Sequence, residues 1–272
     1  MSSKIRLSQN QKDKISRAAL EACWASGELL TRYYLGKAVN AKKLKGPNDL
    51  VTTADLDSCR LFKRLLKKEF PEHSFLFEET EFSENNSSSF LWIIDPLDGT
   101  TFHNRSLPFF SNMLALQLEG RVELGISYSP ISEDLFMAWR GQGTWHLNRR
   151  FRFRRRARVS RLRTLDAALV GYSYGKTQAH AEGMASLLSV LFPKCRAIAR
   201  LGGAEIGYVA SGACEAFIDN SSTPWDFAGI ALMVEEAGGR ATDFCGRRWT
   251  TESKNIIVSN SSLHRQLLDQ IQ

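Results

Sequence analysis

Acidic and hydroxyl side chains follow an apolar run in residues 92–101, which read Trp-Ile-Ile-Asp-Pro-Leu-Asp-Gly-Thr-Thr. The apolar run is rich in strand formers and predicts a buried strand, and Pro96 predicts that strand pairing ends there in a turn. Asp95 and Asp98 then leave the strand end three residues apart, with the carbonyl of Leu97 between them. Their oxygens can converge on one point, and three hard oxygen ligands suit a hard cation such as Mg²⁺.

The same stretch ends in residues that can hold an anion. Gly99 lets a ligand approach the backbone closely, and Thr100 opens the next segment with backbone amides able to bind a phosphate. The alternative is a plain surface turn, because Asp, Pro and Gly are all turn formers. Further acids elsewhere in the chain favour the cation site.

Three of these acids stand where predicted elements begin or end. Glu78 follows a short apolar strand at residues 74–77, and neighbouring strand ends would crowd it against Asp95, a repulsion that bound cations relieve. Asp55 and Asp226 each stand near the start of a predicted helix. For both, the simpler interpretation is an acid that stabilises a helix N-terminus.

Hydrophobic periodicity predicts the elements that must position these side chains. A first helix is capped by Ser8 and ends near Gly36, and a second follows Asp55. We expect strands at 113–118, 121–129, 135–139 and 143–147, then a strand at 168–172, helices at 179–191 and 204–211, a strand at 215–219, and a helix from Pro224 to the glycines at 238 and 239. Helices followed by a run of strands predict helical layers packed on an antiparallel sheet, an α+β or α/β fold.

The 272-residue chain, 43% hydrophobic, is long enough for one well-buried domain or two fused halves. We expect an N-terminal α+β half at 1–148 that carries most of the metal ligands. A basic connecting segment at 149–163 follows, and a C-terminal α/β half at 164–272 supplies Asp226 and the loops that contact substrate.

The net charge of +7 has a local source. Nine arginines and no acid lie between Arg149 and Arg163, which leaves the rest of the chain with a net charge of −2. Such a run is usually a solvated loop or an edge strand protected by charge. The alternative is contact with an anion or RNA, since Phe151 and Phe153 alternate with the arginines.

Cysteine usage and hydropathy point to a cellular compartment. The five cysteines are widely spaced and include no CxxC pair, which argues against a disulfide framework and against a zinc site. No run is long and apolar enough to span a membrane, and the first residues lack the apolar stretch of a secretory signal. We therefore expect a reduced, cytoplasmic protein without a membrane partner.

Three separated segments carry a family resemblance: residues 77–79 (Phe-Glu-Glu), residues 92–101, and the Trp225-Asp226 pair with the helix end Glu-Ala-Gly-Gly at 236–239. In this order and spacing they resemble the inositol monophosphatase family of magnesium-dependent, lithium-sensitive phosphatases, over nearly the whole chain. The resemblance implies a layered αβαβα sandwich, a homodimer, and two or three Mg²⁺ ions per active site.

The resemblance also implies which residues hold the metal ions. Glu78, Asp95 and the carbonyl of Leu97 would surround one Mg²⁺, and Asp95, Asp98 and Asp226 a second. Paired cations neutralise a phosphate ester, lower the pKa of a bound water and stabilise the leaving oxygen.

Catalytic and substrate-binding roles follow from the same resemblance. Thr100 and Asp55 would activate the attacking water, which Glu78 would orient, and the amides of Gly99 and Thr100 would hold phosphate oxygens. Asp98 would contact the substrate from its place beside the second cation. Asp219 would accept a hydroxyl of the leaving group. Lys176 belongs to a segment similar to one that contacts substrate in relatives acting on both inositol phosphate and fructose 1,6-bisphosphate; its alternative is a solvated lysine.

Departures from the family pattern limit the substrate assignment. Phe77 replaces a glycine before the first metal ligand, and Phe102 replaces an asparagine in the pocket wall. The favoured hypothesis is a hydrolase of inositol monophosphate or a related polyol or sugar phosphate, acting through a metal-activated water. A fructose-1,6-bisphosphatase or dual-specificity sugar bisphosphatase is the second hypothesis. The third is a catalytically weak RNA- or protein-binding homologue that uses residues 149–163.

Overall fold

The computed structural model describes residues 6–36, 42–46, 49–78, 88–202 and 206–271. Its elements, in chain order, are α1 (Gln9–Tyr34), β1 (Lys42–Gly46), β2 (Asp49–Thr52), α2 (Thr53–Glu69), β3 (Ser74–Phe77), β4 (Phe90–Asp98), α3 (Thr100–Asn104), β5 (Ser111–Leu118), β6 (Arg121–Ser129), β7 (Asp134–Trp139), β8 (Thr144–Asn148), β9 (Phe153–Arg156), the 3₁₀ turn η1 (Leu165–Ala167), β10 (Leu169–Ser173), α4 (Gln178–Leu191), β11 (Ala197–Arg200), α5 (Gly207–Ser211), β12 (Ala216–Asp219), α6 (Pro224–Glu236), β13 (Gly239–Thr242), β14 (Ile256–Asn260) and α7 (His264–Ile271).

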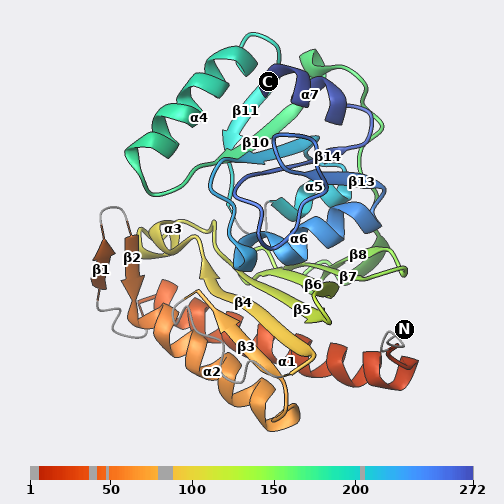
Figure 1. Ribbon diagram of the computed structural model, residues 1–272. Helices are drawn as coiled ribbons and strands as arrows, with labels where there is room; N and C mark the ends of the chain where they lie inside the picture. Colours follow the sequence, from red (N-terminus) through yellow and green to blue (C-terminus); the bar gives the residue numbers. More distant parts are fainter. Residues whose placement is uncertain (1–5, 37–41, 47–48, 79–87, 203–205, 272) are drawn as a thin grey trace.

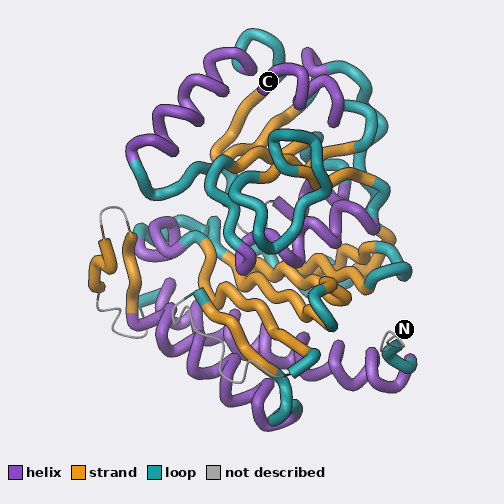
Figure 2. The backbone as a smooth tube through the Cα atoms, viewed as in Figure 1, coloured by secondary structure: helices purple, strands orange, loops and turns teal. Residues whose placement is uncertain are grey.

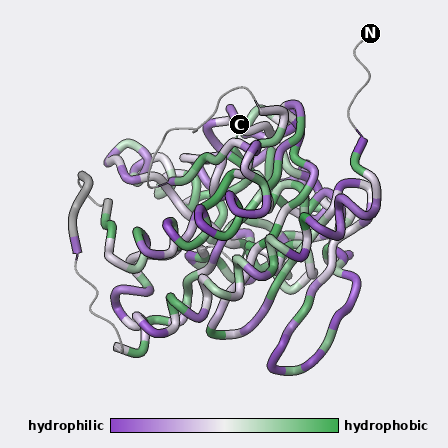
Figure 3. Tube along the Cα trace, turned by 90° about the horizontal axis from the view of Figure 1, so that it is seen from below, coloured by the Kyte–Doolittle hydropathy of each residue, from purple (hydrophilic) through white to green (hydrophobic). Residues whose placement is uncertain are grey.

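The molecule is built of five layers, as the family resemblance implied (Figures 1 and 2). Helices α1 and α2 cover one face of a seven-stranded sheet, and α5 and α6 lie between that sheet and a five-stranded one. Helices α4 and α7 pack on the outer face of the smaller sheet. In Figure 3 hydrophobic segments gather in the middle of the molecule, and many peripheral segments are hydrophilic.

Helix α6 is central to this packing. Its residues are apolar on nearly every side, so the helix is buried from Phe227 to Val234. Ile93 and Phe136 of the large sheet and Phe217 and Val258 of the small sheet share one core cluster with it. Both sheets therefore depend on the same helix, which begins next to Asp226.

Sheet topology brings the predicted site residues to one edge. The large sheet has the strand order β3-β4-β5-β6-β7-β8-β9, in which β3 pairs parallel with β4 and the other neighbours pair antiparallel. Because β3 and β4 run parallel, their carboxyl ends emerge side by side, and the backbone N–H of Glu78 donates to the carbonyl of Ile94 at 3.2 Å. Glu78 and Asp95 thus leave adjacent strand ends.

Most of the predicted elements are present, with one informative difference in β4. We expected strand pairing to stop at Pro96, but β4 continues to Asp98. Asp95 pairs with Met113 and Asp98 with Ser111, so three steps along β4 match two along β5. This extra residue is a bulge, which avoids the need for a proline donor. It also brings Asp95 and Asp98 to the same side, whereas a regular strand would place them on opposite faces.

Part of the arginine-rich segment, the strand β9, forms the outer edge of the large sheet. β9 pairs antiparallel with β8 and is the last strand in the order. Arg154, Arg155 and Arg156 are exposed, in accord with an edge strand protected by charge.

Candidate active site

Three carboxylates meet where β4 ends and α6 begins. Asp95 and Asp98 come from the bulged end of β4, and Asp226 lies in the first turn of α6. One oxygen from each lies within 4.8 Å of the others. Asp95 is only 2% exposed. Residues 131 positions apart in sequence therefore share one small volume.

Packing these acids together has an electrostatic cost. Burial, followed by the nearby charges of Glu78, Asp98 and Asp226, raises the pKa of Asp95 well above its ordinary range. Burial and the charge of Asp98 raise the pKa of Asp226 in the same way. A divalent cation between the carboxylates would remove this repulsion, and an all-oxygen donor set fits Mg²⁺. The residues present therefore fit the metal that the family resemblance implied.

Glu78 completes the acidic site from the neighbouring strand end. Its charge acts on Asp95, and its Oε1 lies 3.6 Å from Nζ of Lys176. The structure thus brings together a predicted metal ligand and a predicted substrate contact from opposite halves of the chain. Glu79 lies outside the described residues.

A second group of predicted residues lies on the other side of the turn. The hydroxyl of Thr100 is 2.8 Å from Oδ1 of Asp55 and 3.1 Å from the carbonyl of Leu97. Asp55 is buried at the start of α2, where its other oxygen accepts from the backbone N–H of Thr52 at 2.8 Å. Burial raises the pKa of Asp55, although these hydrogen bonds offset part of the effect. Asp55 and Thr100, to which the family resemblance gave a shared role, thus form a hydrogen-bonded pair, and Asp55 also takes part in the capping box at the start of α2.

Gly99 shapes the turn between the acids and Thr100. Its φ is +85°, a left-handed conformation that favours glycine. A Cβ there would lie 2.5 Å from the carbonyl oxygen of Phe109, so no larger residue fits without movement.

A buried network of hydrogen bonds holds the turn at Pro96, and it was not predicted from the sequence. The carbonyl of Pro96 accepts from Nδ2 of Asn112 at 2.6 Å and from the hydroxyl of Ser58 at 3.0 Å. Ser26 of α1 lies 2.5 Å from Ser58 and 3.0 Å from Asn112. In the sequence these polar residues stand on otherwise apolar faces. That position indicates that they are buried, but it does not indicate which residues they bind.

A small cavity adjoins the carboxylates. Its volume is about 30 Å³, and its polar lining includes Asp98, Asp226, Ser173 and Asp219. Asp219 is 5% exposed and accepts from the backbone N–H of Ser221 at 2.5 Å. Burial raises the pKa of Asp219. Both predicted hydroxyl-binding and metal-binding acids therefore face one space.

With this fold and geometry in place, comparison with known proteins identifies the class. The chain matches the inositol monophosphatase family over residues 11–272 and belongs to that family. The predicted resemblance and the layered fold are confirmed. This is a family of phosphatases.

Individual relatives carry two kinds of name. The chain is 34% identical to the Nus factor SuhB of Escherichia coli K12 over 254 residues, 92% of each protein. The crystal structure of the extragenic suppressor protein suhB from Bartonella henselae superposes with a TM-score of 0.88 at 32% identity, covering 95% of this chain and 98% of the other. An IMPase from Thermotoga maritima gives a TM-score of 0.84 at 29% identity, covering 95% and 96%.

Within the described ranges, none of the helices has the length and apolar character needed to cross a bilayer.

Proposed function

We propose that this protein is a Mg²⁺-dependent hydrolase of phosphate monoesters that acts on inositol monophosphate or a related polyol phosphate. The observation that carries the proposal is the meeting of Asp95, Asp98 and Asp226 within 4.8 Å, beside the Asp55–Thr100 pair. Membership of a phosphatase family supports the same chemistry.

The acids would hold the metal ions. Asp95, Asp98 and Asp226 would bind one Mg²⁺, and Glu78 with Asp95 and the carbonyl of Leu97 would bind another. Phosphate monoesters hydrolyse extremely slowly unaided, because water must attack an anion and expel an alkoxide. Bound Mg²⁺ would supply charge neutralisation and a more acidic water.

The protein's own residues would move the proton. The hydroxyl of Thr100 donates toward Asp55, so an oxygen lone pair of Thr100 can accept a proton from the attacking water. Its own proton then passes to Asp55, whose raised pKa makes it a better base. The amides of Gly99 and Thr100 would bind the phosphoryl oxygens.

Asp219 and Lys176 would determine which leaving group, and therefore which substrate, the site accepts. Asp219 lies with Ser173 in the cavity next to Asp98, where a carboxylate can accept a sugar or inositol hydroxyl. The side chain of Lys176 is half exposed, lies 3.6 Å from Glu78 and would bind a negatively charged part of the substrate. A sugar bisphosphate is therefore the alternative substrate class.

Phosphate release with and without Mg²⁺ tests the proposal. Inositol 1-phosphate, fructose 1,6-bisphosphate, histidinol phosphate and adenosine bisphosphates form the substrate panel. We expect Mg²⁺-dependent release from inositol phosphate, loss of turnover in Asp98→Asn, and normal turnover in Asp57→Asn, a control aspartate on α2. Phosphate release by Asp98→Asn at the wild-type rate would refute the site assignment.

A nucleic-acid contact at β9 is a second candidate function. The guanidinium groups of Arg154 and Arg156 lie 4.2 Å and 4.4 Å from the ring centre of Trp145, so exposed cations and an aromatic ring share one surface. Such surfaces bind single-stranded nucleic acid through phosphate contacts and stacking, and a relative is named a Nus factor. RNA binding that weakens with salt and with Arg154→Gln, but not with Arg64→Gln on α2, would support this function. Equal effects of the two substitutions would contradict it.

A further inference from the structure

We propose that Glu236 is a positioning residue for the metal site, acting through helix α6 from the end opposite Asp226. This inference rests on the proposed function. Asp226 lies in the first turn of α6 and Glu236 is its last residue. The two ends of one rigid helix are therefore joined to two different parts of the large sheet.

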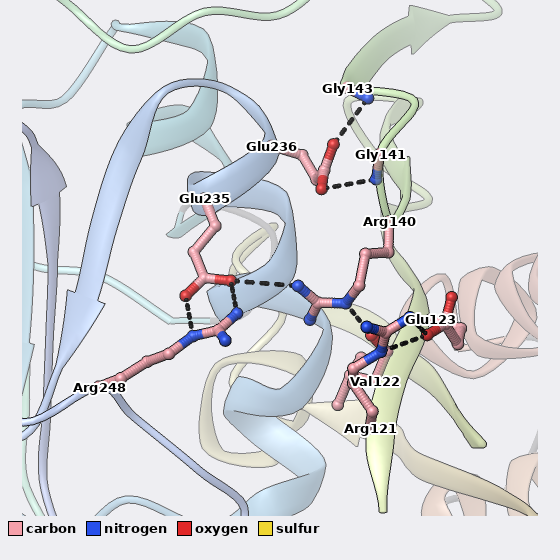
Figure 4. Close-up of polar contacts among 9 residues, drawn as sticks. All are labelled: Arg121, Val122, Glu123, Arg140, Gly141, Gly143, Glu235, Glu236 and Arg248. Carbon is pink, nitrogen blue, oxygen red and sulfur yellow. Dashed lines mark hydrogen bonds and ion pairs between the residues drawn. The ribbon is translucent and has the colours of Figure 1, made fainter. Parts of the chain in front are cut away.

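The carboxylate of Glu236 binds the β7–β8 turn in a specific way. Its two oxygens accept from the backbone N–H groups of Gly141 and Gly143, each at 2.8 Å (Figure 4). Both glycines have positive φ angles, +76° and +72°. Glycine adopts this left-handed conformation readily and few other residues do. In this conformation the turn points both backbone N–H groups toward the same carboxylate. A second tether lies nearby, since the buried hydroxyl of Thr144 donates to the carbonyl of Met233 at 2.5 Å.

The middle of α6 rests directly on the sheet. A Cβ at Gly125 of β6 would lie 2.5 Å from the carbonyl oxygen of Gly229, so the two backbones touch with no side chain between them. This contact sets the distance between helix and sheet. The contacts of Glu236 and Thr144 hold the helix separately, nearer its C-terminal end.

The helix acts as a lever about this contact. Asp226 precedes Gly229 by about 4.5 Å along the axis, and Glu236 follows it by about 10.5 Å, at the usual rise per residue. A displacement of about 1 Å at Glu236 would therefore move Asp226 by about 0.4 Å. Metal–ligand distances tolerate about 0.2 Å, and Mg²⁺ demands a regular geometry. Loss of the Glu236 contacts would thus reach the metal site.

The neighbouring Glu235 makes different contacts and provides a matched control. Its carboxylate binds the Nε and Nη2 groups of Arg248 at 2.8 Å and 2.7 Å, and lies 3.6 Å from Arg140 (Figure 4). Arg248 is largely exposed, and such ion pairs contribute little to stability. Glu235→Gln therefore makes the same chemical change one residue away and leaves both hydrogen bonds between Glu236 and the glycine amides in place.

The test compares Glu236→Gln with Glu235→Gln in the full chain. Glutamine has nearly the same shape but places an NH₂ group against one of the two glycine amides, so one hydrogen bond is lost. We expect Glu236→Gln to weaken Mg²⁺ binding about tenfold by calorimetric titration, the lower range for residues that orient metal ligands. We also expect kcat to fall at subsaturating Mg²⁺ while the substrate KM changes less than about twofold. Glu235→Gln should match the wild type.

The outcomes separate this inference from the proposed function. A folded Glu236→Gln variant with a lower Tm but unchanged Mg²⁺ affinity would show a structural role only and would overturn the inference. A wild-type protein that neither binds Mg²⁺ nor releases phosphate would instead refute the proposed function. If Glu236→Gln does not fold, Glu236→Asp takes its place, because its shorter side chain weakens both contacts with the glycine amides, and unchanged Mg²⁺ affinity in that variant would overturn the inference equally.

Discussion

Replacing Asp95 with asparagine should stabilise the metal-free protein while destroying its response to Mg²⁺. Asparagine has nearly the same shape, and its Oδ1 can still accept from the backbone N–H of Leu97, a bond of 2.9 Å. What changes is the charge. The substitution removes the repulsion of Asp95 with Asp98 and Asp226, whose nearest oxygens lie within 4.8 Å.

The size of the effect follows from this separation. Two full charges at such a distance repel by about 3.5 kcal/mol at an effective dielectric constant of about 20. The carboxyl groups take up protons instead of bearing the whole repulsion, as the raised pKa of Asp95 indicates. We therefore expect a gain of about 1–3 kcal/mol in unfolding free energy, or a Tm higher by about 2–5 °C for a chain of this size.

Thermal unfolding in EDTA and in Mg²⁺ measures both parts of the prediction. The wild-type Tm should rise on adding Mg²⁺, because the cation binds the folded state. The variant should begin higher in EDTA, gain little from Mg²⁺ and release no phosphate.

Asp134→Asn is the matched control, because this buried aspartate has the opposite environment. Burial raises its pKa, but hydrogen bonds from His146, Asn148 and Tyr208 outweigh that effect and leave the pKa well below the ordinary range. Its loss should destabilise the protein by about 1–3 kcal/mol and leave the Mg²⁺ response intact. An Asp95→Asn variant with a Tm in EDTA at or below that of the wild type, or with a normal Mg²⁺ response, would refute the reasoning.

Three further predictions concern the turn, the cation and a buried histidine. Gly99→Ala should lower phosphate release by roughly a hundredfold, because the new Cβ would clash with the backbone of Phe109 and push the turn away from it, and a shift of about 1 Å in catalytic groups costs about this much in rate. A near-normal kcat would contradict this. Lithium, a hard cation, should inhibit phosphate release by replacing Mg²⁺, and full activity in lithium would weaken the metal assignment. Burial lowers the pKa of His264 to about 4, so the unfolded state binds more protons and stability should fall as pH drops from about 6.5 to 4. His264→Gln should remove about 2–3 kcal/mol of this loss, and an unchanged pH dependence of unfolding would show that His264 is not responsible.

Local chemistry explains which parts of the site were predictable. A run of strand-forming residues, a proline and two aspartates lie close together between Trp92 and Thr101. The strand and the acidic turn that follows it could therefore be predicted from these residues alone. Helix α1 was predicted equally well, because its apolar stripe is regular and Ser8 forms a capping box with Gln11.

Features that depend on tertiary pairing were missed. The β4 bulge depends on the register against β5, which the residues of β4 alone do not determine. The hydrogen bonds joining Ser26, Ser58 and Asn112 depend on how two helices meet a strand. The pairing of Asp55 with Thr100, 45 residues away, was by contrast predicted, but only from the family resemblance, because the residues next to Asp55 indicate its place at the start of α2 and nothing about Thr100.

The burial of α6 between two sheets has a consequence for biogenesis. A nascent chain that ends before residue 224 lacks both the helix that fills the space between the sheets and the aspartate at its start. The three-carboxylate cluster and the interior between the two sheets are thus completed by the same segment. During refolding, recovery of Mg²⁺ binding should therefore coincide with the burial of Trp249, which packs in the same core cluster as α6, rather than precede it.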